Sequence, residues 1–189
     1  TLSNLLMLAG VPVADADKPK VFFPAGSTRQ AVAAAAPKPA TLAAGAVAPD
    51  FVMRDINDKE VRLSDFKGKV VILDFWATWC GPCIASFPHT QDLAAKYADQ
   101  DVVVLASGTS DTIAKFKEWI PKNQPKYPNL RFTFDPHERD SATFEQRASS
   151  QLYGVVGIPT QFIIGRDGKI TATVVGNGGK DDARTEAAL

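Results

Sequence analysis

Apolar runs alternate with helical patterns from residue 49 onward. KVVILDFW (69–76) and VVVLASG (102–108) are almost continuously apolar and rich in β-branched residues, which is typical of strands buried on both faces. Residues 80–98 and 112–120 instead repeat apolar side chains at helical spacing, and Asp111 is a candidate cap for the second helix. Strands that alternate with helices predict an α/β domain with a largely parallel central sheet.

Shorter patterns predict the edges of this domain. FVMRDI and EVRL flank a polar turn, which predicts a β-hairpin at residues 51–63. LRFTFD (130–135) has the pattern of a further strand, and TQFIIG and KITATVVG predict a final hairpin over residues 160–176. SATFEQRASSQLYG (141–154) predicts one helix closed by Gly154.

The N-terminal part has a different composition. Residues 31–48 contain ten alanines and two prolines, which predicts a linker or tether, with a short helix ended by Pro37 as the alternative. The apolar stretch Leu5 to Leu8 is either the remnant of an export signal or the edge of a longer segment. We therefore divide the chain into residues 1–44, a tether, linker or remnant of a preceding segment, and residues 45–189, one domain whose last helix is cut short.

Charge and composition exclude several classes of function. The 189 residues carry a formal net charge of zero, and lysines and arginines are spread along the chain, so no nucleic-acid surface is indicated. No apolar run is long enough to cross a membrane. The hydrophobic fraction of 45% is that of a globular domain with its own core, which needs no disulfide for stability.

The chain has two cysteines, Cys80 and Cys83, separated by Gly81 and Pro82. A bridge across two residues closes too short a loop to stabilise the fold much. A structural zinc site needs four ligands, and only His89 and His137 could complete one. Both histidines are expected at the solvated surface, so a redox-active pair is the favoured interpretation.

The location of the pair supports redox chemistry. It follows a buried strand and opens a helix, with Pro82 in the first turn, where a missing N–H needs no partner. Free backbone N–H groups and the helix dipole favour a thiolate at Cys80, the expected nucleophile. Cys83 lies one turn inside the helix and can resolve the mixed disulfide formed at Cys80.

Asp74 is the one charged residue inside the apolar strand before the cysteines, because Lys69 lies at its very start. Burial of a carboxylate disfavours its charged form and raises its pKa, so that it can exchange a proton near neutral pH. We expect it to serve Cys83 in this way. The alternative is that it reaches solvent or a backbone donor at the strand end.

These residues carry a family resemblance. DFWATWCGPC (74–83), Pro88 and GIPTQFII (157–164) resemble the thioredoxin superfamily. APDF, LSDFKGKVV and the added helix and strand of residues 111–134 resemble its TlpA-like and redoxin-like (AhpC/TSA-like) branch of extracytoplasmic thiol–disulfide reductases. The resemblance implies a thioredoxin-like fold: a central mixed sheet flanked by helices, with an N-terminal β-hairpin and an inserted helix–strand element.

The resemblance also implies roles by position. Cys80 matches the exposed nucleophile, Cys83 the resolving thiol and Asp74 the buried acid. The residues that match positions contacting the partner are Trp79, Gly81, Pro82, Ile158 and Pro159. Pro159 is expected to follow a cis peptide bond, and Trp76 and Phe75 belong to the core. One departure concerns VVVLASG, which has no lysine where thioredoxin places one near its buried acid.

The predicted function is that of a thiol–disulfide oxidoreductase that reduces disulfides in extracytoplasmic proteins. Its partners would be disulfide-containing proteins and an upstream electron donor, with no cofactor or metal and no nucleic acid. We expect a monomer whose N-terminal segment is a candidate membrane tether. A thiol peroxidase is one alternative, although Leu73 and Ala77 stand where its motif P-x-x-x-T-x-x-C requires proline and threonine. A non-catalytic binding module is the other.

Overall fold

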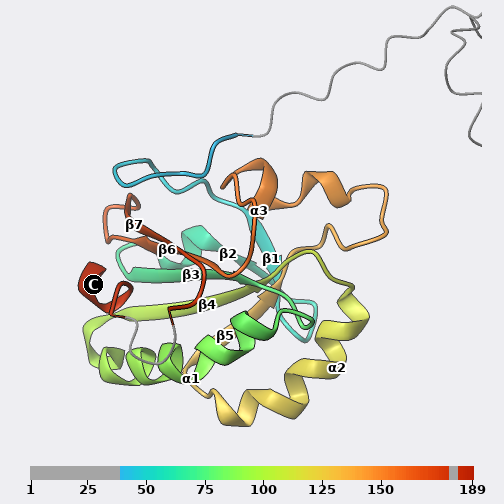
Figure 1. The fold of residues 1–189 in the computed structure, drawn as a ribbon, viewed down its shortest axis with the longest axis horizontal. Helices are drawn as coiled ribbons and strands as arrows, with labels where there is room; N and C mark the ends of the chain where they lie inside the picture. Colours follow the sequence, from blue (N-terminus) through green and yellow to red (C-terminus); the bar gives the residue numbers. More distant parts are fainter. Residues whose placement is uncertain (1–38, 179–182) are drawn as a thin grey trace, which may run out of the picture. The chain divides into compact units, whose positions relative to one another are not determined.

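The computed structural model describes residues 39–178 and 183–189, and its centre is a mixed sheet of seven strands (Figure 1). The strand order is β2-β1-β5-β4-β3-β6-β7. The strands are β1 (Val52–Arg54), β2 (Glu60–Arg62), β3 (Val70–Trp76), β4 (Val102–Gly108), β5 (Leu130–Phe134), β6 (Thr160–Ile164) and β7 (Ile170–Val175).

The three central strands are parallel, and the outer strands are antiparallel to their neighbours. β3 pairs with β4 and β4 with β5 in parallel, whereas β6 runs antiparallel to β3 and β1 antiparallel to β5. The hairpins β1–β2 and β6–β7 close the two edges. The predicted mixed sheet, N-terminal hairpin and inserted helix–strand element are therefore confirmed.

Helices cover both faces of the sheet. α1 and α2 lie on one face and α3 on the other (Figure 1). The α-helices are α1 (Gly81–Lys96), α2 (Ile113–Asn123) and α3 (Ala148–Gln151). The described residues also form short 3-10 turns: η2 (Leu63–Phe66), η3 (Ala98–Gln100), η4 (Gln124–Lys126), η5 (Phe144–Gln146) and η6 (Glu186–Ala188). None of the helices in these residues is both long and apolar enough to span a membrane.

Strand β3 separates two hydrophobic cores because alternate side chains point to opposite faces. Ile72 and Trp76 pack with residues of α1 and α2, including both cysteines. Leu73 and Phe75 pack on the other side, against Tyr153 among others. Every residue of β3 is buried, which confirms the prediction from its almost continuously apolar sequence. By the same alternation, Asp74 faces α1.

The prediction of a linker for residues 31–48 is wrong for residues 39–48, the part that the structure describes. The N–H of Leu42 donates to the carbonyl of Tyr153 at 3.2 Å, and Gly45 and Ala48 donate to the β6–β7 hairpin at 2.8 and 2.9 Å. Val47 forms an isolated antiparallel bridge with Lys169. Backbone pairing of this kind needs no large side chains, so an Ala-rich composition does not reveal it. Residues 1–38 lie outside the described part.

Two helix predictions also need correction. Residues 141–154 form η5 and α3 rather than one helix, with Arg147 in an extended conformation between them. The carboxylate of Asp135 accepts a hydrogen bond from the N–H of Ala148 at 2.7 Å and so starts α3 separately. The cap of α2 is the Thr112 side chain, which accepts from the N–H of Lys115, and Asp111 has a different role.

Candidate active site

The two cysteines form a disulfide at the start of α1, with their Cα atoms 5.3 Å apart. Cys80 is the N-cap of the helix, and its Sγ accepts a hydrogen bond from the N–H of Cys83 at 3.3 Å. Pro82 lies in the first turn, as predicted. The sulfur of Cys80 therefore occupies the position where a helix binds negative charge, next to N–H groups that have no partner within the helix.

Access to the disulfide is narrow. Cys80 is 3% exposed and Cys83 is fully buried, so the order of exposure agrees with the assigned roles, although Cys80 is less exposed than the resemblance implies. Gly81 and Pro82 are exposed between them, and a Cβ added at Gly81 would meet no atom within 4 Å. The Pro82 carbonyl accepts a hydrogen bond from the side chain of Asn177 at 2.9 Å. In this oxidised state Gly81 and Pro82 are the solvent-exposed residues of the motif, and the two sulfur atoms lie beneath the surface.

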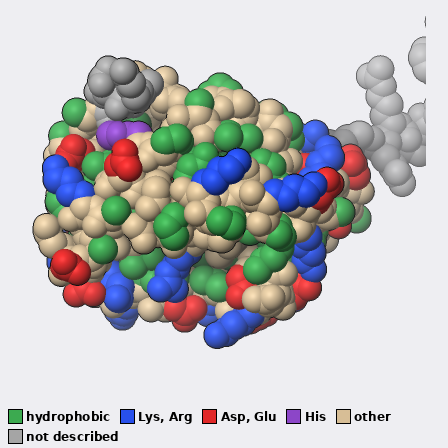
Figure 2. All heavy atoms as spheres, turned by 90° about the horizontal axis from the view of Figure 1, so that it is seen from below, with side chains coloured by type: hydrophobic (Ala, Val, Ile, Leu, Met, Phe, Trp, Pro, Cys, Tyr) green, Lys and Arg blue, Asp and Glu red, His purple; other side chains and the backbone are tan. Residues whose placement is uncertain are grey.

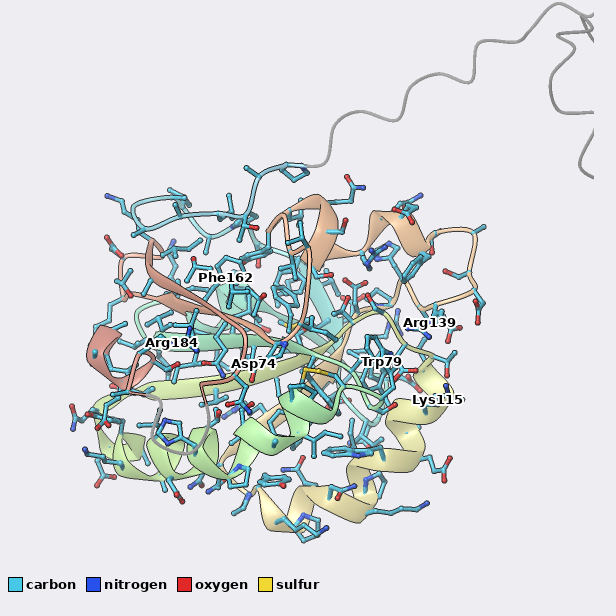
Figure 3. The ribbon with its side chains drawn as sticks, viewed as in Figure 1. Asp74, Trp79, Lys115, Arg139, Phe162 and Arg184 are labelled. Carbon is cyan, nitrogen blue, oxygen red and sulfur yellow. A yellow bond between two sulfur atoms is a disulfide. The ribbon has the colours of Figure 1, made fainter. Side chains whose placement is uncertain are left out.

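Asp74 lies in the middle of the sheet, opposite Ala106 of β4 and Gln161 of β6. It is fully buried, so it does not reach solvent at the strand end. Burial raises the pKa of its carboxyl group from 3.8 to about 7, while the hydrogen bond from Gln161 lowers it. The bond runs from Gln161 Nε2 to Asp74 Oδ2 at 3.0 Å, and Oδ1 has no hydrogen-bond partner among the described residues. Asp74 can thus take up and return a proton near neutral pH, on the face that α1 covers (Figure 3).

Asp111 holds the loop that carries the first cysteine. Its buried carboxylate accepts hydrogen bonds from both the N–H and the hydroxyl of Thr78, and a third from the N–H of Thr112. These bonds join the turn after β3 to the turn after β4. Sequence reasoning missed this role because Asp111 and Thr78 are 33 residues apart. The one sequence feature that indicates this role is the charge of Asp111, close to the end of an apolar strand.

Trp79 projects beside the disulfide, and half of its surface (51%) is exposed. Its indole N–H donates to the carbonyl of Ser110 at 3.0 Å, and the guanidinium of Arg139 lies 5.2 Å from the ring centre (Figure 3). The hydrogen bond and the cation–π contact fix the ring in place. A large apolar surface held rigidly next to a reactive group can contact a partner at low entropic cost.

The loop before β6 lies near the active site. The peptide bond between Ile158 and Pro159 is cis, as the resemblance implies, and Ile158 packs against the core cluster that contains both cysteines. A groove of about 220 Å³ lies between this loop and Trp79. Val156 on its rim is 92% exposed. The groove is lined by Trp79, Thr109, Ser110, Arg147, Ser149, Val155, Val156, Gly157 and Ile158.

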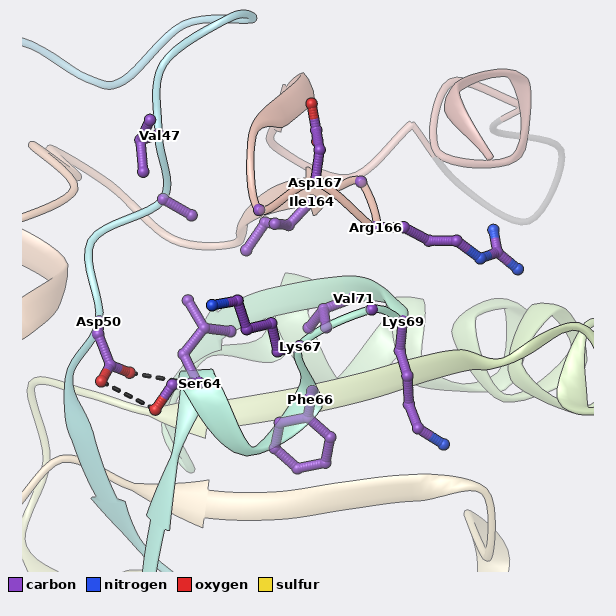
Figure 4. Close-up of a pocket in the computed structure, with 15 residues that line it drawn as sticks. Val47, Asp50, Ser64, Phe66, Lys67, Lys69, Val71, Ile164, Arg166 and Asp167 are labelled. Carbon is purple, nitrogen blue, oxygen red and sulfur yellow. Dashed lines mark hydrogen bonds between the residues drawn. The ribbon is translucent and has the colours of Figure 1, made fainter.

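A second cavity, of about 310 Å³, lies at the opposite end of β3 (Figure 4). Val71 and Ile164 contribute to its apolar lining, Asp50 accepts two hydrogen bonds from Ser64 beside it, and Lys67 and Lys69 stand around it. None of the predicted site residues lines it. It is therefore separate from the site around the disulfide.

The histidines are not the simply solvated residues that we predicted. Nε2 of His89 is buried and has no hydrogen-bond partner in the part of the chain that the structure describes, and Nδ1 of His137 lies 2.7 Å from the buried carboxylate of Asp135. No group of three or more side chains suited to a metal occurs in the described residues. Neither histidine therefore extends the site around the disulfide.

On the face formed by α1 and α2, positive and negative side chains are interspersed (Figure 2).

Comparisons with known proteins agree with this geometry. The AhpC/TSA family model matches residues 44–173. The thiol-disulfide oxidoreductase ResA of Bacillus thuringiensis is 33% identical over 137 residues, which cover 72% of each chain. The exposed lipoprotein thioredoxin Etrx1 of Streptococcus pneumoniae is 36% identical, with a TM-score of 0.58 over 74% of this chain and 98% of that one. A candidate thiol:disulfide interchange protein DsbE of Chlorobium tepidum is 35% identical, with a TM-score of 0.63 over 78% and 96% of the two chains.

The mixed sheet and the cysteine pair at the start of α1 define a thioredoxin-like thiol–disulfide oxidoreductase. The chain belongs to the AhpC/TSA family and is similar to ResA within it. Its substrates are accordingly molecules that contain disulfides, and it exchanges electrons with redox partners. The predicted family, fold class and enzyme class are confirmed.

The position of Cys80 predicts a test of thiolate activation. We expect the Cys80 thiol of the reduced protein to have a pKa below that of free cysteine, because the start of α1 stabilises its anion. Alkylation by iodoacetamide, followed against pH in the Cys83→Ser variant, reports Cys80 alone. Free cysteine measured in parallel is the reference. A rate profile that coincides with free cysteine would contradict activation by the helix.

Proposed function

We propose that this protein reduces disulfides in other proteins outside the cytoplasm through the Cys80–Cys83 couple. The observation that carries the proposal is the placement of Cys80 as the N-cap of α1 over a sheet that buries Asp74. This arrangement provides both an activated sulfur and a proton acceptor. Two thiols that become one disulfide supply the two electrons needed, so no cofactor enters the reaction.

The first step is attack on the partner. The Cys80 thiolate forms a bond to one sulfur of the partner's disulfide, and the partner's S–S bond breaks. The partner's other sulfur leaves as a thiolate and is protonated. The product is a mixed disulfide between Cys80 and the partner, with Cys83 still a thiol.

The second step releases the partner. Cys83 loses its proton, for which the Asp74 carboxylate is the proposed acceptor, and its thiolate attacks Cys80 Sγ. The mixed disulfide breaks, the second partner thiol is freed, and the Cys80–Cys83 disulfide forms. Cys83 is fully buried, so external water cannot serve as its base directly. A donor then reduces the protein for the next cycle.

The loop at Pro159 is the proposed docking site for the partner chain. In the described part of the structure nothing accepts a hydrogen bond from the backbone N–H of Val156 or Ile158. Unpaired backbone groups next to a groove can pair with an extended peptide. The exposed surfaces of Trp79, Gly81 and Pro82 would complete the contact on the other side of the disulfide.

The proposed direction of electron transfer and the proposed cellular location are based on resemblance to other proteins. The Gly81-Pro82 dipeptide together with Asp74 resembles thioredoxin, which indicates a reductant. The similarity to an exposed lipoprotein thioredoxin of S. pneumoniae supports action outside the cytoplasm, and we propose that the residues before Leu42 serve as a tether. We also propose that the domain acts as a monomer.

Two assays of the purified protein test the proposal. Reduction of insulin disulfides with a dithiol donor should depend on both cysteines, whereas hydrogen peroxide should not be turned over. The potential of the Cys80–Cys83 couple should lie near that of thioredoxin, about −270 mV, rather than near that of DsbA, about −120 mV. Rapid peroxide turnover would favour the thiol peroxidase, and no turnover of either substrate would favour the binding module.

A further inference from the structure

The side chain of Gln161 is the one hydrogen-bond partner of the Asp74 carboxyl group among the described residues. The two residues face each other across β3 and β6, and both are buried. The amide N–H of Gln161 stabilises the charged carboxylate without adding a charge of its own. Gln161 is thus the neighbour whose side chain can influence the protonation of Asp74.

Thr185 fixes the direction of this amide. Its hydroxyl donates to Gln161 Oε1 at 2.7 Å, and the Thr185 side chain is itself buried. An amide has a donor end and an acceptor end of nearly equal shape. Because a hydroxyl donor holds the oxygen end, the N–H end points to Asp74. Without Thr185 the amide could turn and present its oxygen to the carboxylate, which would be repulsive.

Among the residues that the structure describes, few ionisable groups lie near Asp74 to compete with Gln161. On α1, Cys83 shares the sheet face with Asp74, and β4 places only Ala106 opposite it. The nearby C-terminal segment holds Arg184, which donates to the carbonyls of Val175 and Gly176, and Glu186, which pairs with Lys96. His89 borders a cavity of about 20 Å³ that Gln161 and Thr185 also line. This cavity has room for one water molecule, and Gln161 lines it whereas Asp74 does not.

We propose that Gln161 is a positioning residue of disulfide exchange, whose amide, oriented by Thr185, sets how readily Asp74 accepts the proton of Cys83. The inference rests on the proposed function, because it deepens the role given to Asp74. The proton moves from the Cys83 thiol to the Asp74 carboxylate, while the Cys83 sulfur attacks Cys80. The proton later returns to bulk solvent. A stronger hydrogen bond from Gln161 makes Asp74 a weaker base.

The experiment uses four variants of the full chain. Gln161→Met keeps the length of the side chain, and so leaves the cavity closed, but removes the donor. Thr185→Val removes the orienting hydroxyl and Thr185→Ser keeps it. Thr173→Val is the matched control, because Thr173 also donates its hydroxyl to a carbonyl oxygen, that of Leu42, at 2.8 Å. Should Gln161→Met fail to fold, the pair at Thr185 carries the test.

The first measurement is the titration of Asp74 in the oxidised protein, followed by the carboxyl 13C shift, which requires no turnover. Loss of a hydrogen bond to a charged group should raise the midpoint by about one to two pH units in Gln161→Met. Thr185→Val should move it in the same direction by less. Thr185→Ser and Thr173→Val should match the parent. An unmoved midpoint in both Gln161→Met and Thr185→Val would overturn the inference.

The second measurement is the pH profile of mixed-disulfide resolution in single-turnover experiments. We expect its rising limb to move upward with the Asp74 midpoint in Gln161→Met. A moved midpoint with an unmoved profile would also overturn the inference, while leaving the oxidoreductase intact. Failure of the parent to reduce insulin would instead contradict the proposed function itself, so the two failures are distinguishable.

Discussion

Cys83→Ser should stop the reaction at the mixed disulfide between Cys80 and the partner. Serine fits the buried space of Cys83, and Cys80 keeps its place at the start of α1, so the first attack proceeds. Resolution then depends on external thiol. A well-oriented intramolecular thiol acts at an effective concentration far above millimolar, so release should slow by at least about 1,000-fold. Non-reducing gels should show covalent adducts that disappear on reduction.

Cys80→Ser is the matched variant, with the same change three residues earlier. It should form few adducts, because Cys83 is fully buried while Cys80 retains some exposure. Mass mapping of the linked cysteine distinguishes the two sites. Adducts that form equally through Cys83 would reverse the assigned roles, and adducts through neither cysteine would support the binding module. The trapped species would also identify the physiological partner.

The asymmetry between the thiols could be predicted from the sequence because it depends on local order. A buried strand followed by Cys-Gly-Pro-Cys and a helical pattern places Cys80 at the helix start. Asp74 could be found as well, since one carboxylate interrupts an apolar run. Both predictions use only neighbours in sequence, where the strand and helix periods determine which face each residue occupies.

The partners of these residues could not be predicted, because they come from distant segments. Gln161 meets Asp74 across 87 residues, and Thr185 meets Gln161 across a further 24. Asp111 was expected to cap α2, yet its carboxylate accepts hydrogen bonds from Thr78 in another loop. In each case a polar side chain satisfies a buried group in tertiary structure, and its own sequence surroundings carry no sign of that group.

Asp74→Asn should remove a large pH dependence of stability. The folded protein holds the Asp74 carboxyl at a pKa of about 7, against 3.8 for an exposed group, because burial disfavours the charge. The folded state therefore binds a proton that the unfolded state has released between these two pH values. Stability from this group is complete below about pH 4 and is lost as the pH rises to 7. The total loss is about 4 kcal/mol, a large part of an ordinary stability of roughly 5–15 kcal/mol.

Urea unfolding of the oxidised protein between pH 4 and pH 9 measures this difference, since the disulfide removes both cysteine titrations. The parent should lose about 4 kcal/mol more than Asp74→Asn over that range, with most of the loss below pH 8. Asp99→Asn, a charge removal at an exposed site, should follow the parent. Parallel curves for parent and Asp74→Asn would mean that Asp74 is ionised at the same pH in the folded and unfolded states. It would then have no proton to exchange near neutral pH, and another group would have to serve Cys83.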